Sequence, residues 1–169
     1  MNQWYALYTK SRAEKKANIE LQKIGIETYL PLRKEFRQWS DRKKWVETPI
    51  ISSYIFVRID TEDFRKILDI NNIVSFVSYK RKALSIPDRE IEAMKRVVEN
   101  KISFSVEKGD LKKGKNITFI SGPLEGITGE ITEIKGQKKL FIRIKHADFS
   151  LVVDIDENTM FQIDTSSDL

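Results

Sequence analysis

Glycine is distributed so unevenly along this chain that it constrains the fold more than any other feature. Of the seven glycines, only Gly25 precedes residue 109. The other six lie in the C-terminal part of the chain, at Gly109, Gly114, Gly122, Gly126, Gly129 and Gly136. Because glycine supplies the positive-φ positions of tight turns and bulges, this density is typical of a small β-barrel. We therefore expect a first domain over residues 1–100, a linker over 101–109 and a second domain over 110–169.

The N-terminal part of the chain alternates patterns of strand and helix. Strands are predicted over 3–9, 53–59 and 73–79, helices over 11–24, 61–70 and from 85 onward, and a hairpin of two extended arms over 26–39 and 44–48. Gly25 ends the first helix, and Pro87 opens the last one. The order β-α-β-β-α-β-α predicts an α/β sandwich around an antiparallel sheet.

The C-terminal part shows only strand patterns. Five short runs are separated by turn residues, and they lie over 116–121, 129–134, 140–145, 149–155 and 159–163. Five such strands predict a small closed barrel, which removes unpaired sheet edges. The whole chain is therefore predicted to be an α+β protein with a mixed first domain and an all-β second domain.

Several classes of chemistry are disfavoured by composition. The chain has no Cys and one His, His146, which excludes disulfides, cysteine nucleophiles and zinc fingers. The glycines around residues 122–129 match neither a dinucleotide fingerprint nor a phosphate loop. We expect no catalytic residue, metal site or cofactor. No apolar run approaches a membrane span, so we expect a cytoplasmic protein, monomeric and without a membrane partner.

Positive charge is concentrated in the first third of the chain. Residues 1–50 hold 11 basic and 6 acidic side chains, a net +5, whereas residues 101–169 hold 10 and 11, a net −1. This asymmetry indicates a polyanionic partner for the N-terminal end, with an ordinary solvated surface as the alternative. At the hairpin tip, Arg42 and Lys43 flank Trp39, and such a cluster could contact phosphates and stack an unpaired base.

Aromatic residues form a second candidate surface. Tyr54 and Phe56 are two positions apart on one predicted strand, so their side chains share a face. If Tyr8 lies on a neighbouring strand with the same facing, the three rings form an apolar patch with hydroxyl tips, which suits a protein interface. The alternative is that the rings are core residues. That interpretation is favoured for Phe56, whereas both remain open for the two tyrosines.

Three segments resemble the NusG-type transcription elongation factors. The opening WYALYTK (4–10) with its basic helix and the strand SYIFV (53–57) are similar to their N-terminal domain. The stretch 109–130 resembles their KOW motif. The hairpin RQWSDRKK (37–44), together with ISS (51–53) where the family often has Phe-Pro-Gly, resembles specialised antiterminators of the UpxY and RfaH kind. The resemblance implies an elongation or antitermination factor acting on selected operons; an RNA-binding or ribosome-associated KOW protein is the alternative.

The resemblance also implies roles for individual residues. In the family, the N-terminal domain grips the clamp of RNA polymerase and approaches the non-template DNA strand. The matching polymerase contacts are Tyr8, Tyr54 and Phe56, with Ile91 and Met94 on the rim and Arg65 and Lys66 facing the opposite jaw. The matching DNA contacts are Lys10, Arg12, Lys16 and Asn72. The barrel would bind Rho or a small-subunit ribosomal protein through Phe149, and it is expected to remain a barrel rather than refold into helices.

Overall fold

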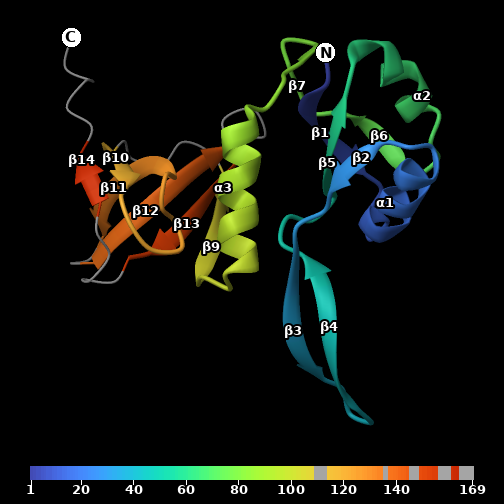
Figure 1. Ribbon diagram of the computed structural model, residues 1–169. Coiled ribbons are helices and arrows are strands. Elements are labelled where there is room, and N and C mark those ends of the chain that lie inside the picture. The colour runs from blue at the N-terminus through green and yellow to red at the C-terminus, as the bar shows by residue number, and fades with distance from the viewer. Residues whose placement is uncertain (109–113, 135–136, 145–148, 156–160, 164–169) are drawn as a thin grey trace. The chain divides into compact units, whose positions relative to one another are not determined.

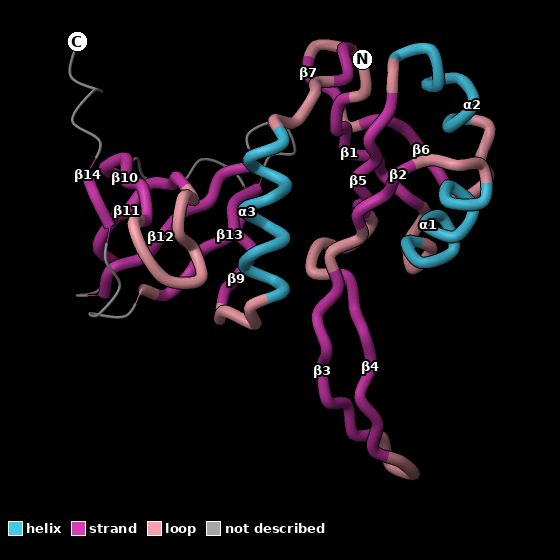
Figure 2. Tube along the Cα trace, in the orientation of Figure 1, coloured by secondary structure: helices cyan, strands magenta, loops and turns pink. Residues whose placement is uncertain are grey.

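The computed structural model describes residues 1–108, 114–134, 137–144, 149–155 and 161–163 (Figures 1 and 2). Contacts divide the chain into two compact units, Met1–Ile86 and Pro87–Leu169. This division groups the helix over 88–99 with the second unit, whereas the sequence analysis assigns it to the first domain. No helix in the described ranges is both long and apolar enough to cross a membrane.

The first unit is built on a four-stranded antiparallel sheet. Its strand order is β2-β5-β1-β6, with bounds β1 (Gln3–Thr9), β2 (Glu27–Tyr29), β5 (Tyr54–Ile59) and β6 (Ile73–Phe76). The central pair β1 and β5 aligns Tyr8 with Tyr54 and Ala6 with Phe56. Because side chains alternate across a sheet, these four residues share one face and Leu7 and Ile55 point to the other.

The helices α1 (Glu14–Lys23) and α2 (Phe64–Leu68) contribute to the core of the first unit on the Leu7 face of the sheet, and a 3₁₀ turn, η1 (Thr61–Asp63), precedes α2. Ala17 and Leu21 of α1 and Ile67 of α2 are fully buried in this core. The sequence predicts α1 from residue 11, but Arg12 has a φ of +59°, which is incompatible with a right-handed helix. Helix α1 therefore begins at Glu14, and residues 11–13 of the predicted segment form the turn that leads into it.

Two smaller hairpins complete the first unit. Strands β3 (Leu32–Gln38) and β4 (Lys43–Pro49) form a two-stranded sheet of their own, and β7 (Ser78–Tyr79) pairs with β8 (Lys82–Ala83). The longer hairpin extends away from the four-stranded sheet of its unit (Figure 1). At its base, Ile50 donates a backbone hydrogen bond to Pro31 at 3.0 Å, and both residues are buried.

The second unit combines helix α3 (Asp88–Glu99) with an antiparallel sheet of order β14-β10-β11-β12-β13-β9. The five predicted strands are present, as β10 (Lys115–Phe119), β11 (Thr128–Ile134), β12 (Gln137–Ile144), β13 (Phe149–Asp154) and β14 (Phe161–Ile163). Their buried residues include Ile117, Leu140 and Leu151, each with no exposed surface. The sequence-based assignment of a mixed first domain and a β second domain is thus confirmed.

A sixth strand in this unit corrects the sequence analysis. The predicted linker over 101–109 contains β9 (Phe104–Lys108), which pairs with β13 through Leu151 and Val106. Phe104 and Val106 are partly buried while Ser105 and Glu107 are exposed, which is the alternation of an edge strand. The pairing covers an edge of β13 that would otherwise expose unpaired backbone groups.

Candidate functional site

Tyr8 and Tyr54 form a pair on the face of the sheet opposite the helices. Their strands β1 and β5 bring them directly opposite each other. The Tyr54 hydroxyl donates a hydrogen bond to the Tyr8 hydroxyl at 2.9 Å, and the two rings meet edge to face with centroids 4.8 Å apart. Tyr8 is 37 % exposed, whereas Tyr54 is 6 % exposed. The structure therefore presents Tyr8 at the surface and holds it there through Tyr54.

Phe56 lies beside this pair, but its side chain is not exposed to solvent. It is fully buried, and its ring centroid is 6.2 Å from that of Tyr29 on the neighbouring strand β2. The interpretation of Phe56 as a core residue therefore agrees with its burial. Ile91 and Met94, which the resemblance places on the rim, lie on α3 in the second unit and are also fully buried.

Arg65 and Lys66 lie on the short helix α2 and are both exposed. The Lys66 ammonium is 3.3 Å from the Asp63 carboxylate, one turn earlier. Such an exposed pair is weak and exchanges readily with another partner. Both cations are therefore available to an acidic surface.

The turn before α1 meets the turn before β6 and brings Lys10 next to Asn72. The Lys10 backbone donates a hydrogen bond to the Asn72 carbonyl at 3.0 Å, and the Lys10 ammonium donates to the side-chain oxygen of Asn71 at 2.8 Å. The Asn72 amide in turn donates to both oxygens of Glu20, at 2.8 and 3.0 Å. Asn72 is thus engaged within the unit, and Asn71 and Glu20 are members of this cluster that sequence reasoning missed.

Arg12 and Lys16 are exposed, as Lys10 is; Arg12 lies in the turn before α1 and Lys16 in the first half of the helix. The positive φ of Arg12 is unusual for a residue with a side chain. Nothing in the sequence signals it, because Asn, Asp and Gly are the residues that ordinarily adopt this conformation. A non-glycine residue held in it is one of the features that concentrate at functional sites.

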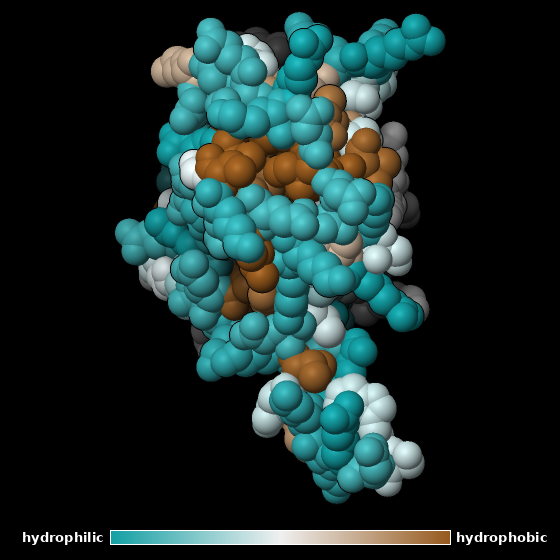
Figure 3. Space-filling view, turned by 90° about the vertical axis from the view of Figure 1, so that its right-hand side faces the viewer, coloured by the Kyte–Doolittle hydropathy of each residue, from teal (hydrophilic) through white to brown (hydrophobic). Residues whose placement is uncertain are grey.

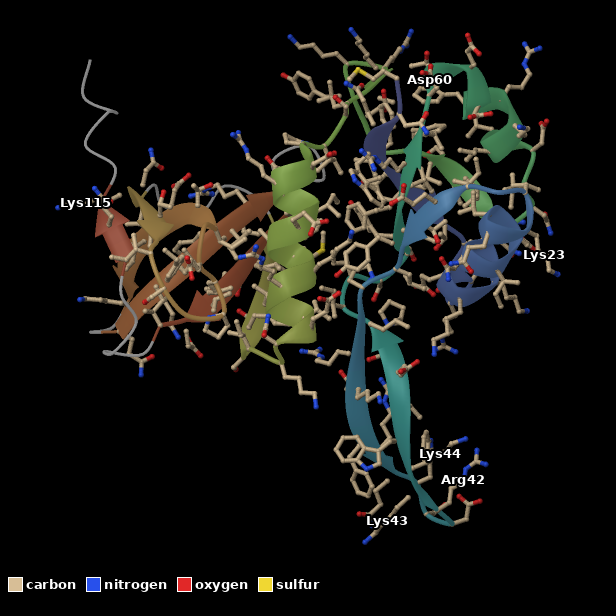
Figure 4. All side chains as sticks on the ribbon, viewed as in Figure 1. Lys23, Arg42, Lys43, Lys44, Asp60 and Lys115 are labelled. Carbon is tan, nitrogen blue, oxygen red and sulfur yellow. The ribbon has the colours of Figure 1, made fainter. Side chains whose placement is uncertain are left out.

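The tip of the long hairpin gathers the residues that the sequence analysis singled out there. The Trp39 backbone donates a hydrogen bond to the Arg42 carbonyl at 2.8 Å, and the Arg42 guanidinium lies over the Trp39 ring, 5.4 Å from its centroid. Lys43 pairs across the strands with Gln38. Figure 4 shows Arg42, Lys43 and Lys44 together at this tip.

Two further aromatic residues on this hairpin were missed. Phe36 and Trp45 are cross-strand partners with ring centroids 5.3 Å apart, and they are 53 % and 64 % exposed. The signal was present in the sequence, because each lies at an alternating position of its arm. What the sequence could not provide is the register that places the two rings opposite each other.

The other face of the hairpin is partly neutralised by one carboxylate. The Glu35 carboxylate lies 3.1 Å from Arg33 and 3.2 Å from Arg37 on the same strand. The hydrogen bond from Arg37, together with the charges of both guanidinium groups, holds the pKa of Glu35 below its usual value. The carboxylate therefore remains ionised and offsets one of the two arginine charges.

In the second unit, the structure buries Phe149, the residue matched to a partner contact. It is 3 % exposed and pairs with Ile144 on β12 and with β9 on the other side. A partner would have to contact other side chains of this unit. A bidentate polar contact joins β11 to β12 in this unit: Arg143 donates to the two oxygens of Glu130 at 2.8 and 3.1 Å.

Within the described ranges, no group of three or more His, Asp or Glu side chains is arranged to hold a metal ion. His146, which the sequence analysis considered, lies outside those ranges. The side of the first unit that carries α1 and α2 is largely hydrophilic, with an apolar band across it (Figure 3). The candidate interaction surfaces of the first unit are the tyrosine pair, the basic turn before α1 and the hairpin.

Comparison with known proteins agrees with this architecture. A family model described as transcription termination factor NusG matches residues 2–95. A structure of NusG from Thermotoga maritima, solved for its domain interaction, is 22 % identical, covers 92 % of this chain and 98 % of its own, and superposes with a TM-score of 0.50. A chain of the MjSpt4:Spt5 complex is 14 % identical, covers 90 % and 99 %, and has a TM-score of 0.32. No curated protein matches the chain. The likeness to the Thermotoga protein shows a shared fold.

Proposed function

This chain belongs to the NusG family of transcription factors, since the family model covers 94 of its 169 residues, and on that premise we propose that it acts on elongating RNA polymerase. In this proposal it docks on the polymerase clamp, contacts the non-template DNA strand and suppresses pausing or termination on selected operons. It does so by binding alone, with no reaction of its own. Stabilising one state of a two-state machine through differential affinity is sufficient for such an effect.

The Tyr8–Tyr54 pair is the observation that carries the docking proposal. Tyrosine offers a large apolar ring with a polar tip and loses little side-chain entropy on binding, which is why it is enriched at protein interfaces. The hydrogen bond at 2.9 Å fixes the Tyr8 ring before a partner arrives. Preorganisation of this kind reduces the cost of association.

The exposure of each side chain decides which of the other matched residues we propose as polymerase contacts. Ile91, Met94 and Phe56 expose no surface, so we assign the contact itself to Tyr8 and treat Phe56 as support beneath it. Arg65 and Lys66 are exposed on α2 and suit an acidic partner surface. A chain that holds two surfaces of a polymerase cleft at once would restrain their separation.

The proposed DNA contacts are exposed cations near the start of α1, namely Lys10, Arg12 and Lys16. Asn72 supports them through the backbone of Lys10, and its own amide is directed to Glu20. A few cations give weak binding at physiological salt, because affinity for nucleic acid depends on how many phosphates are neutralised. They therefore suit a strand that is already held nearby by the polymerase.

We assign the second unit to a protein partner rather than to nucleic acid. Its segment 101–169 has a net charge of −1, from 10 basic and 11 acidic residues, which disfavours a polyanion. Rho and a small-subunit ribosomal protein are the two candidates. Because Phe149 is buried, the contact would use neighbouring exposed residues of the sheet.

Retention of the tagged full-length chain on purified RNA polymerase tests the proposal, followed by a transcription assay on templates that contain a pause and a terminator. We expect the polymerase to retain the chain and read-through to increase. Co-purification of ribosomal RNA without polymerase would instead support the alternative of a ribosome-associated protein. Retention that is unchanged by Tyr8→Ala would overturn the assignment of the docking surface.

A further inference from the structure

The long hairpin carries an aromatic surface that the proposed polymerase contact does not use. Phe36 and Trp45 are 53 % and 64 % exposed, and Trp39 at the tip is 40 % exposed. Large aromatic rings are ordinarily buried, and a cluster of them in water marks an interaction surface. Among the strands of the described ranges, β3 and β4 pair only with each other, so their sheet gives these rings no core to join.

The strand register decides which charges accompany the rings. Side chains alternate across a strand, so Lys34 lies on the same face as Phe36, and Lys43 on the same face as Trp45. Across the two strands, Phe36 lies directly opposite Trp45, and Gln38 lies directly opposite Lys43. The aromatic face of the hairpin, defined here as Lys34, Phe36, Lys43, Trp45 and Glu47, therefore places a cation on each side of the ring pair, and the Glu47 carboxylate lies opposite Lys34.

The hairpin is also positively charged as a whole. Residues 32–49 contain six basic and three acidic side chains, a net +3. On the opposite face, Glu35 is paired with Arg33 and Arg37. Among the described residues, Lys34 and Lys43 make no ion pair, so their charges accompany the rings. The aromatic face thus carries one excess positive charge, from Lys34 and Lys43 against Glu47, and the opposite face carries two, from Arg33, Arg37 and Lys44 against Glu35.

We propose that the aromatic face of the hairpin binds an unpaired nucleic-acid strand, with bases stacked on Trp45 and Phe36 and phosphates contacted by Lys34 and Lys43. Aromatic rings interleaved with cations are the arrangement by which proteins hold single strands without reading sequence. The two rings are inclined at 59°, so they can take separate bases. The inference rests on the proposed function, because the unpaired strand would be the non-template DNA of an elongation complex.

A single strand fits this surface better than the other occupants. A duplex hides the faces of its bases, so it would engage the lysines and leave the rings in water. A protein partner for an apolar surface would be depleted in charge at the contact, whereas here cations border both rings. The combination of exposed rings and flanking lysines is complementary to a polyanion with accessible bases.

The three tryptophans provide a direct readout. Trp4 is 3 % exposed, so it reports the interior, whereas Trp39 and Trp45 lie on the hairpin. In the full chain carrying Trp39→Phe, the accessible fluorescence comes from Trp45. We expect single-stranded DNA oligonucleotides to quench it at low salt, and duplex DNA of the same length to leave it unchanged. Absence of quenching by the single strand would overturn the proposal.

The variant Trp45→Ile distinguishes stacking of a base on the Trp45 ring from simple apolar contact with the side chain. Isoleucine keeps strand propensity and an apolar side chain but has no aromatic face. We expect affinity for the single strand to fall about tenfold, as loss of one stacked base implies. Tyr79→Ala is the matched control, because Tyr79 is 63 % exposed and has Lys80 over its ring, but lies on another hairpin. Full affinity in Trp45→Ile, or equal loss in Tyr79→Ala, would contradict the stacking model.

The inference can fail separately from the proposed function. Circular dichroism and protease resistance of Trp45→Ile show whether the hairpin is intact. If every hairpin variant keeps its affinity for the oligonucleotide while polymerase still retains the chain through Tyr8, only the inference is overturned. If the hairpin binds single strands but polymerase does not retain the chain, the proposed function fails and the inference survives.

Discussion

The Tyr54 hydroxyl donates a hydrogen bond to the Tyr8 hydroxyl at 2.9 Å across the central strands of the first unit. Tyr54 is nearly buried and Tyr8 is about one-third exposed. One residue thus anchors the pair while the other presents its ring. This division of roles makes different predictions for the two positions.

Tyr8→Ala should weaken retention by RNA polymerase while leaving the fold intact. Removing an interface tyrosine of this kind costs about 2 kcal/mol, or roughly thirtyfold in affinity. Retention is measured on immobilised polymerase over a concentration series. Tyr79→Ala serves as the control, because it removes an exposed aromatic ring elsewhere in the same unit. An affinity equal to that of the unmodified chain would remove Tyr8 from the docking surface.

Tyr54→Phe should destabilise the first unit slightly. The change removes the donor of one hydrogen bond and leaves the ring in place, which costs about 1 kcal/mol. Tyr54→Ala should cost about 3 kcal/mol or more, because it also leaves a cavity. Urea titration followed by circular dichroism gives both values. Equal losses for the two variants would show that the ring contributes little packing.

Glu35→Gln should lower stability at neutral pH but not in acid. The Arg37 hydrogen bond and the neighbouring charges hold the folded-state pKa of Glu35 below its unfolded value. The carboxylate therefore stabilises the fold above the unfolded pKa, and this contribution disappears as the pH falls through the folded pKa. The group is solvent-exposed, so the effect is small.

The measurement compares the free energy of unfolding of both chains at neutral pH and at about pH 3, below the usual range for Glu. Glu47→Gln is the control, since Glu47 lies on the other strand and makes no ion pair among the described residues. A difference between Glu35→Gln and the unmodified chain that stays constant with pH would show that the ion pairs do not contribute.

Gly114→Ala should strongly destabilise the second unit. A Cβ at this position would lie 2.2 Å from the backbone carbonyl oxygen of Ile131, which cannot move without breaking the sheet. Overpacking of this kind costs about 3 kcal/mol. Gly122→Ala is the comparison: its φ of +81° disfavours a side chain, but no atom lies within 4 Å of its Cβ position. That variant should lose about 1 kcal/mol. Equal losses in thermal unfolding would contradict the close contact at Gly114.

Local patterns in the sequence were sufficient for most of the elements. Alternation predicted β1 with its observed bounds, and glycine density predicted the β-rich second unit. Local patterns did not predict β9, because Phe104 and Val106 become a strand only when the edge of β13 is present to pair with them. The start of α1 was also misplaced, because Arg12 adopts a positive φ in the turn before the helix, next to the backbone hydrogen bond from Lys10 to the distant Asn72.

The sequence by itself determined which residues have chemistry to offer: tyrosines at alternating positions, cations before the first helix, and aromatic rings with lysines along the hairpin. Only the tertiary structure decided which of them are available. Cross-strand register placed Tyr54 beneath Tyr8 and Phe36 beside Trp45, and long-range packing buried Phe149 and engaged Asn72 with Glu20. The physical reason is that periodicity is a local property of the chain, whereas exposure and pairing depend on residues far apart in sequence.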